Sequence, residues 1–435
     1  MTEILQVVIQ FIIFLFLSCF PINKIITPNI FDKLEKSIFN CFFVNIILLL
    51  FLLLLLSFTK IPLNLIFNLV IIFYFFLFLI NSNKIINDLL NIKNLTLIIF
   101  FSIINIFLFI KIANNFEIGW DGLSIWLFKA NNFYNNHDYF NLANVEGMQN
   151  YPHFGGYLWA FFWKNTFLEK EYLGRLFYMY LYILSLFIII TSVKNISNIK
   201  KIFFLYLLFI FSFDFSLTGY QEYIIFALLV FSAKQLFLII NEKNNSKIIY
   251  ISLIANLVVL SWIKNECIFY VIFISIIFII LTSDNKRKIL LSVITLSSIS
   301  IQIYLIKYFM DANTLGQLEM SSGFIETFFD GNLLKKFYYI TIFLFFHSSL
   351  KYFICLINLV SIITSIFLKK NIKENLFIYF FLLLNLLFIY SIYLLDPYSS
   401  LIWHLQTSIK RLMLQTSGFY IFIFINLLNK KIIKF

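Results

Sequence analysis

Charged residues are scarce in this chain. Only 12% of its 435 residues are Asp, Glu, Lys or Arg, while 61% are hydrophobic. A soluble globular domain carries roughly 25% charged residues, about twice this share. Apolar runs near the ~20 residues that cross a bilayer recur along the whole length. The composition therefore excludes a soluble globular protein, and long runs in place of ten-residue alternation exclude an outer-membrane barrel.

Cysteine and arginine are nearly absent as well. The four cysteines are scattered through apolar segments without metal-ligand spacing, which is typical of packing residues. Only Arg175, Arg287 and Arg411 stand among the 33 basic residues, so lysine carries most of the net charge of +12. In a soluble protein this charge would suggest nucleic acid. Here most of the lysines lie in short loops of the kind that face the cytoplasm.

The apolar runs predict an all-α polytopic membrane protein with about thirteen transmembrane helices. The segment Phe337–Phe346 is too short to span and is expected in the membrane interface. The expected spans are Leu5–Phe20, Ile38–Phe58, Leu63–Ile80, Leu95–Phe109, Leu173–Ile190, Ile202–Phe213, Tyr220–Ile240, Ile248–Trp262, Cys267–Leu281, Ile289–Phe309, Tyr352–Leu368, Leu376–Leu395 and Gly418–Leu428.

The basic residues predict the orientation of the chain. One set of loops holds nineteen Lys and Arg and the opposite set thirteen, so the richer set is expected in the cytoplasm, with the N-terminus out and the C-terminus in. All four histidines and all six tryptophans then fall on the external side or within a turn of it. We expect an inner (plasma) membrane protein whose chemistry faces outside. The richer set comprises the C-terminus and residues 21–37, 81–93, 191–201, 241–247, 282–288 and 369–373.

One long polar segment, residues 114–171, breaks the apolar pattern. Six of the eleven glycines and four of the six tryptophans lie between Glu117 and Arg175. We predict an external catalytic loop that carries amphipathic helices along the membrane. Residues 1–94 then form N-terminal transmembrane helices and residues 95–435 a transmembrane catalytic region, without a separate soluble domain.

The first candidate site residue is Asp121, in G-W-D-G of this loop, with Glu117 four residues earlier. A carboxylate at the membrane surface can serve as a general base. It can equally be the N-cap of the amphipathic run Leu123–Ala130, and both roles can hold at once. The second candidate is Glu222 in T-G-Y-Q-E-Y, a very short external turn, where a carboxylate suggests either function or a capped, solvated turn.

The third candidate is W-I-K-N-E-C, in which Lys264 and Glu266 interrupt two helices with almost no loop. The two side chains can pair with each other, or Lys264 can face a phosphate while Glu266 orients the site. The fourth is the amphipathic stretch Tyr398–Leu412, which is too polar to span comfortably. It is either an interfacial anchor or a phosphate site, because the guanidinium of Arg411 matches phosphate geometry.

Together these motifs describe an external cavity with carboxylates, cations and aromatic walls, and they resemble the multi-pass GT-C glycosyltransferases. The resemblance is to the bacterial branch related to protein mannosyltransferases and the aminoarabinose transferase of lipid A. G-W-D-G-L-S-I-W-L-F-K-A is similar to the Asp-bearing first external loop of that family, and Y-P-H-F-G-G-Y-L-W to the turn that follows it. G-Y-Q-E resembles a Gly-Tyr-x-Asp element, with Glu222 in place of the Asp. K-N-E and W-H-L-Q-T-S-I-K-R-L resemble later family elements.

The resemblance implies transfer of a sugar from a polyprenyl-phosphate donor to a lipid, glycan or protein acceptor on the external face, with inversion. Asp121 would be the base and Glu222 a second catalytic carboxylate. Lys264, Arg411 and His404 would bind the donor phosphate. No metal ligand is assigned, although a divalent metal beside the two carboxylates is compatible with the family. Further residues expected to bind substrate are Glu117, Trp120, Trp126, Tyr151, His153, Glu266 and Ser408.

Two other functions fit a multi-pass chain. An O-antigen polymerase or ligase also has polar external loops, but its catalytic loop typically comes late in the chain. A flippase or transporter of lipid-linked sugars predicts matching halves and charged residues near the midplane. The chain shows no internal repeat, and Lys234 is the one good midplane candidate.

Overall fold

The structure is a computed structural model, and every regular element in its described residues is a helix. It describes residues 3–20, 38–89, 92–114, 117–144, 151–164, 171–193, 197–210, 218–240, 247–306, 332–347, 372–395 and 398–432. The elements are α1 (Glu3–Cys19), α3 (Ile38–Ser57), α4 (Leu63–Leu89), α5 (Ile92–Asn114), η2 (Gly122–Leu127), α6 (Phe128–Tyr134), η3 (Tyr139–Asn144), α7 (Phe154–Trp163), α8 (Tyr172–Thr191), α9 (Asn198–Ile210), α10 (Glu222–Ile240), α11 (Lys247–Ser261), α12 (Cys267–Leu281), α13 (Asn285–Tyr304), α15 (Leu333–Ile342), η6 (Phe343–His347), α18 (Ile372–Leu394) and α19 (Tyr398–Ile432).

The all-helical prediction is confirmed for the described residues. Five helical segments are long and apolar enough to cross a membrane, and the shorter α1, α11, α12 and the end of α18 are also apolar. The total of thirteen spans stays a prediction, and the expected span Tyr352–Leu368 lies outside the described residues. The five long segments are Ile38–Ser57, Leu63–Ser82, Leu95–Asn114, Tyr172–Thr191 and Glu222–Ile240.

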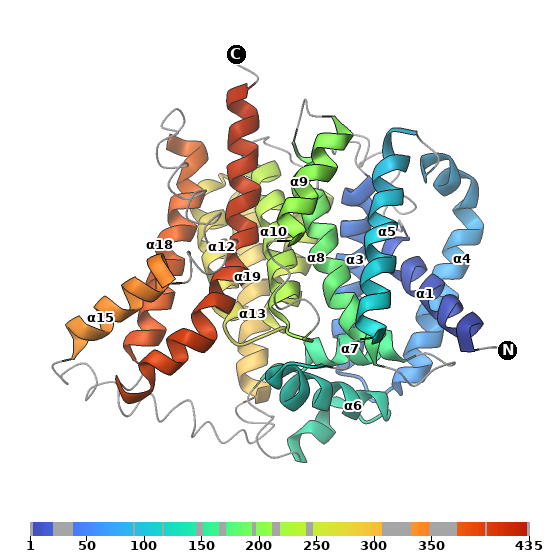
Figure 1. Ribbon diagram of the computed structural model, residues 1–435, viewed down its shortest axis with the longest axis horizontal. Coiled ribbons are helices and arrows are strands. Elements are labelled where there is room, and N and C mark those ends of the chain that lie inside the picture. Colours follow the sequence, from blue (N-terminus) through green and yellow to red (C-terminus); the bar gives the residue numbers. More distant parts are fainter. Residues whose placement is uncertain are drawn as a thin grey trace.

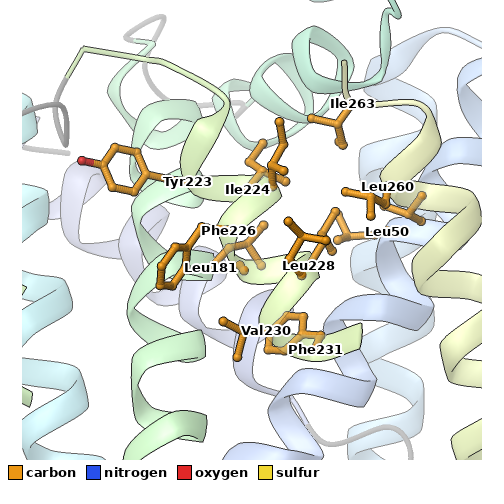
Figure 2. Packing of buried hydrophobic residues seen from close by; sticks show 14 of the residues in the cluster. Leu50, Leu181, Tyr223, Ile224, Phe226, Leu228, Val230, Phe231, Leu260 and Ile263 are labelled. Carbon is orange, nitrogen blue, oxygen red and sulfur yellow. The ribbon is translucent and has the colours of Figure 1, made fainter. Parts of the chain in front are cut away.

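Helix α10 forms the centre of the bundle. It packs against α8, α11 and α19, and Figure 2 shows Leu181 and Leu50 beside its residues. Its side chains are buried from Glu222 to Leu238, which explains why the sequence is apolar on all sides of this helix. Helix α10 therefore has no face that contacts solvent between these residues.

The outer helices α4 and α5 expose apolar side chains instead. Ile72 and Phe76 of α4 and Ile103 and Ile110 of α5 are more than half exposed. So much apolar surface would aggregate in water, but it is well solvated by lipid chains. The pattern of burial therefore agrees with a bundle that sits in a membrane.

The segment between α5 and α8 contains short helices rather than open loop. Figure 1 shows α6 lying across one end of the bundle, next to α7. Helices α10 and α12 begin at this end, at Glu222 and Cys267, and α11 finishes there at Ser261. The turns that join these helices and the short helices of the loop segment therefore meet.

Helix α19 differs from the prediction. The sequence suggested a short amphipathic element at Tyr398–Leu412 and a separate span from Gly418, but one helix runs from Tyr398 to Ile432. The polar residues between them do not break it, because Thr416 and Ser417 donate to backbone carbonyls of the preceding turn. Gly418 allows close contact with α10, where an added Cβ would lie 2.6 Å from Val230.

Candidate functional site

Two glycines bring the loop segment onto the turn before α10. The amide of Gly119 donates to the carbonyl of Thr218 at 2.9 Å. A Cβ on Gly119 would lie 2.6 Å from the ring of Tyr220, and one on Gly122 would lie 2.4 Å from the Thr218 carbonyl oxygen. Only residues without side chains allow this approach. The approach places Asp121 next to the first turn of α10, which begins with Glu222.

Five charged side chains, from four separate segments, meet at this point, and we call them the charged cluster. They are Asp121, Glu222, Lys264, Glu266 and Arg411. Arg411 Nη1 donates to Asp121 Oδ2 and lies 3.8 Å from Glu222 Oε1. Lys264 Nζ lies 2.9 Å from Glu222 Oε1 and 3.3 Å from Glu266 Oε1. The pairing of Lys264 with Glu266 that the sequence suggested is thus present, within a larger network.

The members of the charged cluster differ in burial. The side chain of Glu222 is 2% exposed and that of Lys264 9%, whereas Asp121 is 19% and Arg411 21% exposed. Burial alone would lower the pKa of Lys264, but the charges of Glu222 and Glu266 outweigh it and raise that pKa. Lys264 is therefore positively charged at neutral pH. The second oxygen of Glu222, Oε2, is buried without a hydrogen-bond partner.

Aromatic side chains line the cluster. The Lys264 ammonium lies 6.0 Å from the ring centre of Trp126, and the Arg411 guanidinium 5.5 Å from that of Tyr220. Tyr151 packs edge-on against Trp126 at 5.8 Å. Partial burial raises the pKa of the Tyr151 and Tyr220 hydroxyls, with smaller effects from the charged cluster. Both hydroxyls therefore stay protonated at neutral pH and can donate hydrogen bonds.

The N-cap interpretation of Asp121 is wrong. Its backbone is helical, with φ −61° and ψ −36°, and its side chain makes no capping hydrogen bond. The carboxylate is instead paired with Arg411. The π-helical turn η2, which begins at Gly122, follows directly, and such turns are frequent at functional sites.

Gln415 supports the cluster and was not predicted. It lies on α19 one turn after Arg411 and is fully buried. Its amide nitrogen donates to Glu266 Oε1 at 3.2 Å, and its oxygen accepts from the Tyr270 hydroxyl at 2.9 Å. Glu266 is thereby held between α12 and α19. This role could not be predicted, because the partners of a lone Gln before a transmembrane run cannot be recognised from the chain alone.

Lys129 is a second residue that sequence reasoning missed. It is buried, its ammonium donates to the carbonyls of Tyr151 and Pro152, and it lies 5.9 Å from the Trp126 ring centre. Burial lowers its pKa to about 7. Lys129 ties the turn that carries Tyr151 to α6. In the sequence it looks like one more lysine on an amphipathic helix.

Two other predicted loop residues lie outside the cluster. His153 is buried among Phe58, Tyr139 and Trp262, and its Nε2 lies 2.7 Å from Ser57 Oγ. Burial, together with the charge of Lys129, lowers the pKa of its imidazole. Trp120 is 74% exposed. His153 therefore connects the loop segment to α3 through Ser57. The side chain of Trp120 lies on the surface of the protein.

The remaining predicted site residues are Ser408, His404 and Glu117. Ser408 Oγ lies 2.7 Å from the Tyr393 hydroxyl and donates to the carbonyl of His404. His404 contacts Trp403 and precedes Arg411 by seven residues, which is ~10 Å along a helix. The side chain of Glu117 is exposed. The structure thus brings together Asp121, Trp126, Tyr151, Glu222, Lys264, Glu266 and Arg411. Among the described contacts, those of His153 and Ser408 are with other residues, and Trp120 is exposed.

The other two arginines have structural partners. Arg175 pairs with Glu171 at 2.6 Å and donates to the carbonyls of Ile112 and Glu117, which fixes both ends of the loop segment. Arg287 pairs with Asp284 in the turn before α13. Arg411 therefore stands apart from the other two as the arginine of the charged cluster.

No group of His, Cys, Asp and Glu in the described part of the chain has the arrangement of a metal site. The three carboxylates of the cluster are paired with Lys264 and Arg411. A comparison with protein-family models, with curated proteins and with solved structures finds no match. Fold and site define a helical bundle, with helices long and apolar enough to cross a membrane, that carries a charged cluster lined by aromatic residues at one end.

Proposed function

We propose that the protein is a membrane glycosyltransferase that moves a sugar from a polyprenyl-phosphate donor to a lipid, glycan or protein acceptor at the external face of the plasma membrane. One observation carries the proposal. Asp121, Glu222, Lys264, Glu266 and Arg411 come from four distant segments and converge at one end of an apolar helical bundle. Buried and half-buried charges are costly near a membrane, so such a convergence needs a function.

In this proposal Asp121 is the general base. It takes the proton of the acceptor hydroxyl while the acceptor oxygen attacks the anomeric carbon. The bond between that carbon and the phosphate oxygen breaks, and its electron pair stays on the phosphate. Lys264 and Arg411 stabilise this negative charge. Attack opposite to the leaving phosphate inverts the anomeric centre.

The surroundings of the cluster support a sugar attached to a lipid. The rings of Trp126, Tyr151 and Tyr220 offer apolar faces and polar edges, which suit a sugar. The bundle exposes wide apolar surfaces to the bilayer, along which a polyprenyl chain can lie.

The test is transfer activity in nanodiscs. Wild type and Asp121→Asn are given a panel of polyprenyl-phosphate sugars and a cell-envelope lipid extract, and glycosylated products are measured by mass spectrometry. We expect wild-type transfer and a loss of about 10²- to 10⁴-fold in the variant, the usual contribution of a general base. Asp138→Asn, in the same loop segment, is the matched control and should keep its activity. Equal activity of wild type and Asp121→Asn would remove Asp121 from the chemistry.

The transporter alternative predicts a charge near the membrane midplane. Lys234 is buried on α10, but its ammonium donates at 2.7 Å to Asn40, in the first turn of α3. This partner lies at a helix end, where a lysine is far less costly than at the midplane. We therefore favour the transferase. Movement of donor across the bilayer without transfer would reverse this choice.

A further inference from the structure

The cations of the charged cluster are already paired with the protein's own carboxylates. Arg411 Nη1 is engaged by Asp121 and faces Glu222, while the Lys264 ammonium is held by Glu222 and Glu266. Three carboxylates thus surround two cations. A phosphate group adds further negative charge beside three carboxylates, so its binding to Arg411 and Lys264 is stronger when a carboxylate moves away.

Of the three carboxylates, Asp121 is the one that can leave. Glu222 is buried at the start of α10, and Glu266 is fixed by both Lys264 and Gln415. Asp121 is carried by the loop segment outside the bundle, and its side chain is the most exposed to solvent together with that of Glu266. A rotation of its side chain releases Arg411 without disturbing a transmembrane helix.

We propose that the ion pair between Asp121 and Arg411 is an autoinhibitory latch that the phosphate of the substrate opens. The inference rests on the proposed function. While the latch is closed, the guanidinium holds Oδ2 of Asp121, so this oxygen is not available to an acceptor hydroxyl or to water. When the phosphate takes Arg411, Asp121 becomes available beside the anomeric carbon. Donor must therefore bind before the acceptor can be deprotonated.

The latch predicts that removing a catalytic carboxylate improves phosphate binding. Undecaprenyl phosphate without a sugar is the probe, and its Kd for the full-length protein in nanodiscs is measured by native mass spectrometry. We expect Asp121→Asn to bind it about ten-fold more tightly than wild type, because the amide no longer competes for Arg411. Arg411→Gln should bind it about ten-fold more weakly. Asp138→Asn is the control and should match wild type, and thermal unfolding verifies that each variant is folded.

The outcomes separate the latch from the proposed function. Tighter binding by Asp121→Asn supports the latch, and if wild type shows no sugar transfer, only the transferase is overturned. Equal or weaker binding by folded Asp121→Asn overturns the latch and leaves the transferase standing, since the ion pair would then be structural. Absence of binding to every variant overturns both.

Discussion

Asp121 and Arg411 lie 290 positions apart in the chain, yet their side chains form an ion pair in the charged cluster. In a sequence so rich in lysine, an arginine where lysine would supply the same charge indicates a need for its planar fork. That reasoning singled out Arg411 correctly as a residue of the cluster. It could not distinguish Arg411 from Arg175, whose guanidinium serves the fold through Glu171 and two carbonyls. The rarity of arginine reduces the number of candidate site arginines to three. Their neighbours in the structure then decide which one belongs to the charged cluster.

Lys129 gives a prediction about pH. Its pKa is lowered to about 7 in the folded protein, whereas an exposed lysine titrates near 10.5. Between these values the unfolded chain binds the extra proton, so stability rises with pH across this window and is lost as pH falls through 7. We expect Lys129→Met to abolish this slope. The measurement is the thermal unfolding temperature of both proteins from pH 6 to 10. A constant difference between the two curves would show that Lys129 titrates normally.

At the scale of elements, Gly119 and Gly122 allow the loop segment to pack closely against the turn before α10. The sequence showed that glycines are concentrated between Glu117 and Arg175, and the structure explains two of them by the contact with the turn at Thr218. The short helices of this segment were expected as amphipathic elements. The continuity of α19 was not expected, because the polar bonding of Gln415 to Glu266 and Tyr270 cannot be recognised without the partner helix.

Gly122→Ala should therefore weaken the site without touching a charged residue. An added Cβ would lie 2.4 Å from the Thr218 carbonyl oxygen, a backbone atom that cannot swing aside. We expect the loop segment to shift, with a loss of stability of about 1–3 kcal/mol and of transfer activity of up to about 10²-fold. Ser124→Ala, in the same turn, is the control, since Ser124 is half-buried and bonds only within its own helix in the described contacts. Unfolding and transfer assays on both variants test this, and a neutral Gly122→Ala would disprove the close docking.

For the whole molecule, the helical class and most helix positions follow from hydrophobic run length alone, because crossing a bilayer dictates both length and polarity. The five long apolar segments of the structure each fall on an expected span. The sequence also indicated that distant polar motifs share one face, and five of their charged residues do meet. Which side chain pairs with which could not be predicted, because pairing depends on helix rotation and on glycine contacts, not on spacing along the chain.

The orientation of the bundle in its membrane is the last prediction. Helix α12 begins beside Glu266 and has fifteen residues, so the turn before α13 lies ~22 Å away along its axis, at the opposite end. Asn135, after α6, and Lys286, in α13, are both exposed. If the charged cluster faces outside, a membrane-impermeant maleimide should label Asn135→Cys in intact cells and label Lys286→Cys only after permeabilisation. The described native cysteines are buried or half-buried and give little background. Labelling of Lys286→Cys alone in intact cells would invert the topology. It would place the cluster in the cytoplasm, where a soluble nucleotide sugar could replace the lipid-linked donor.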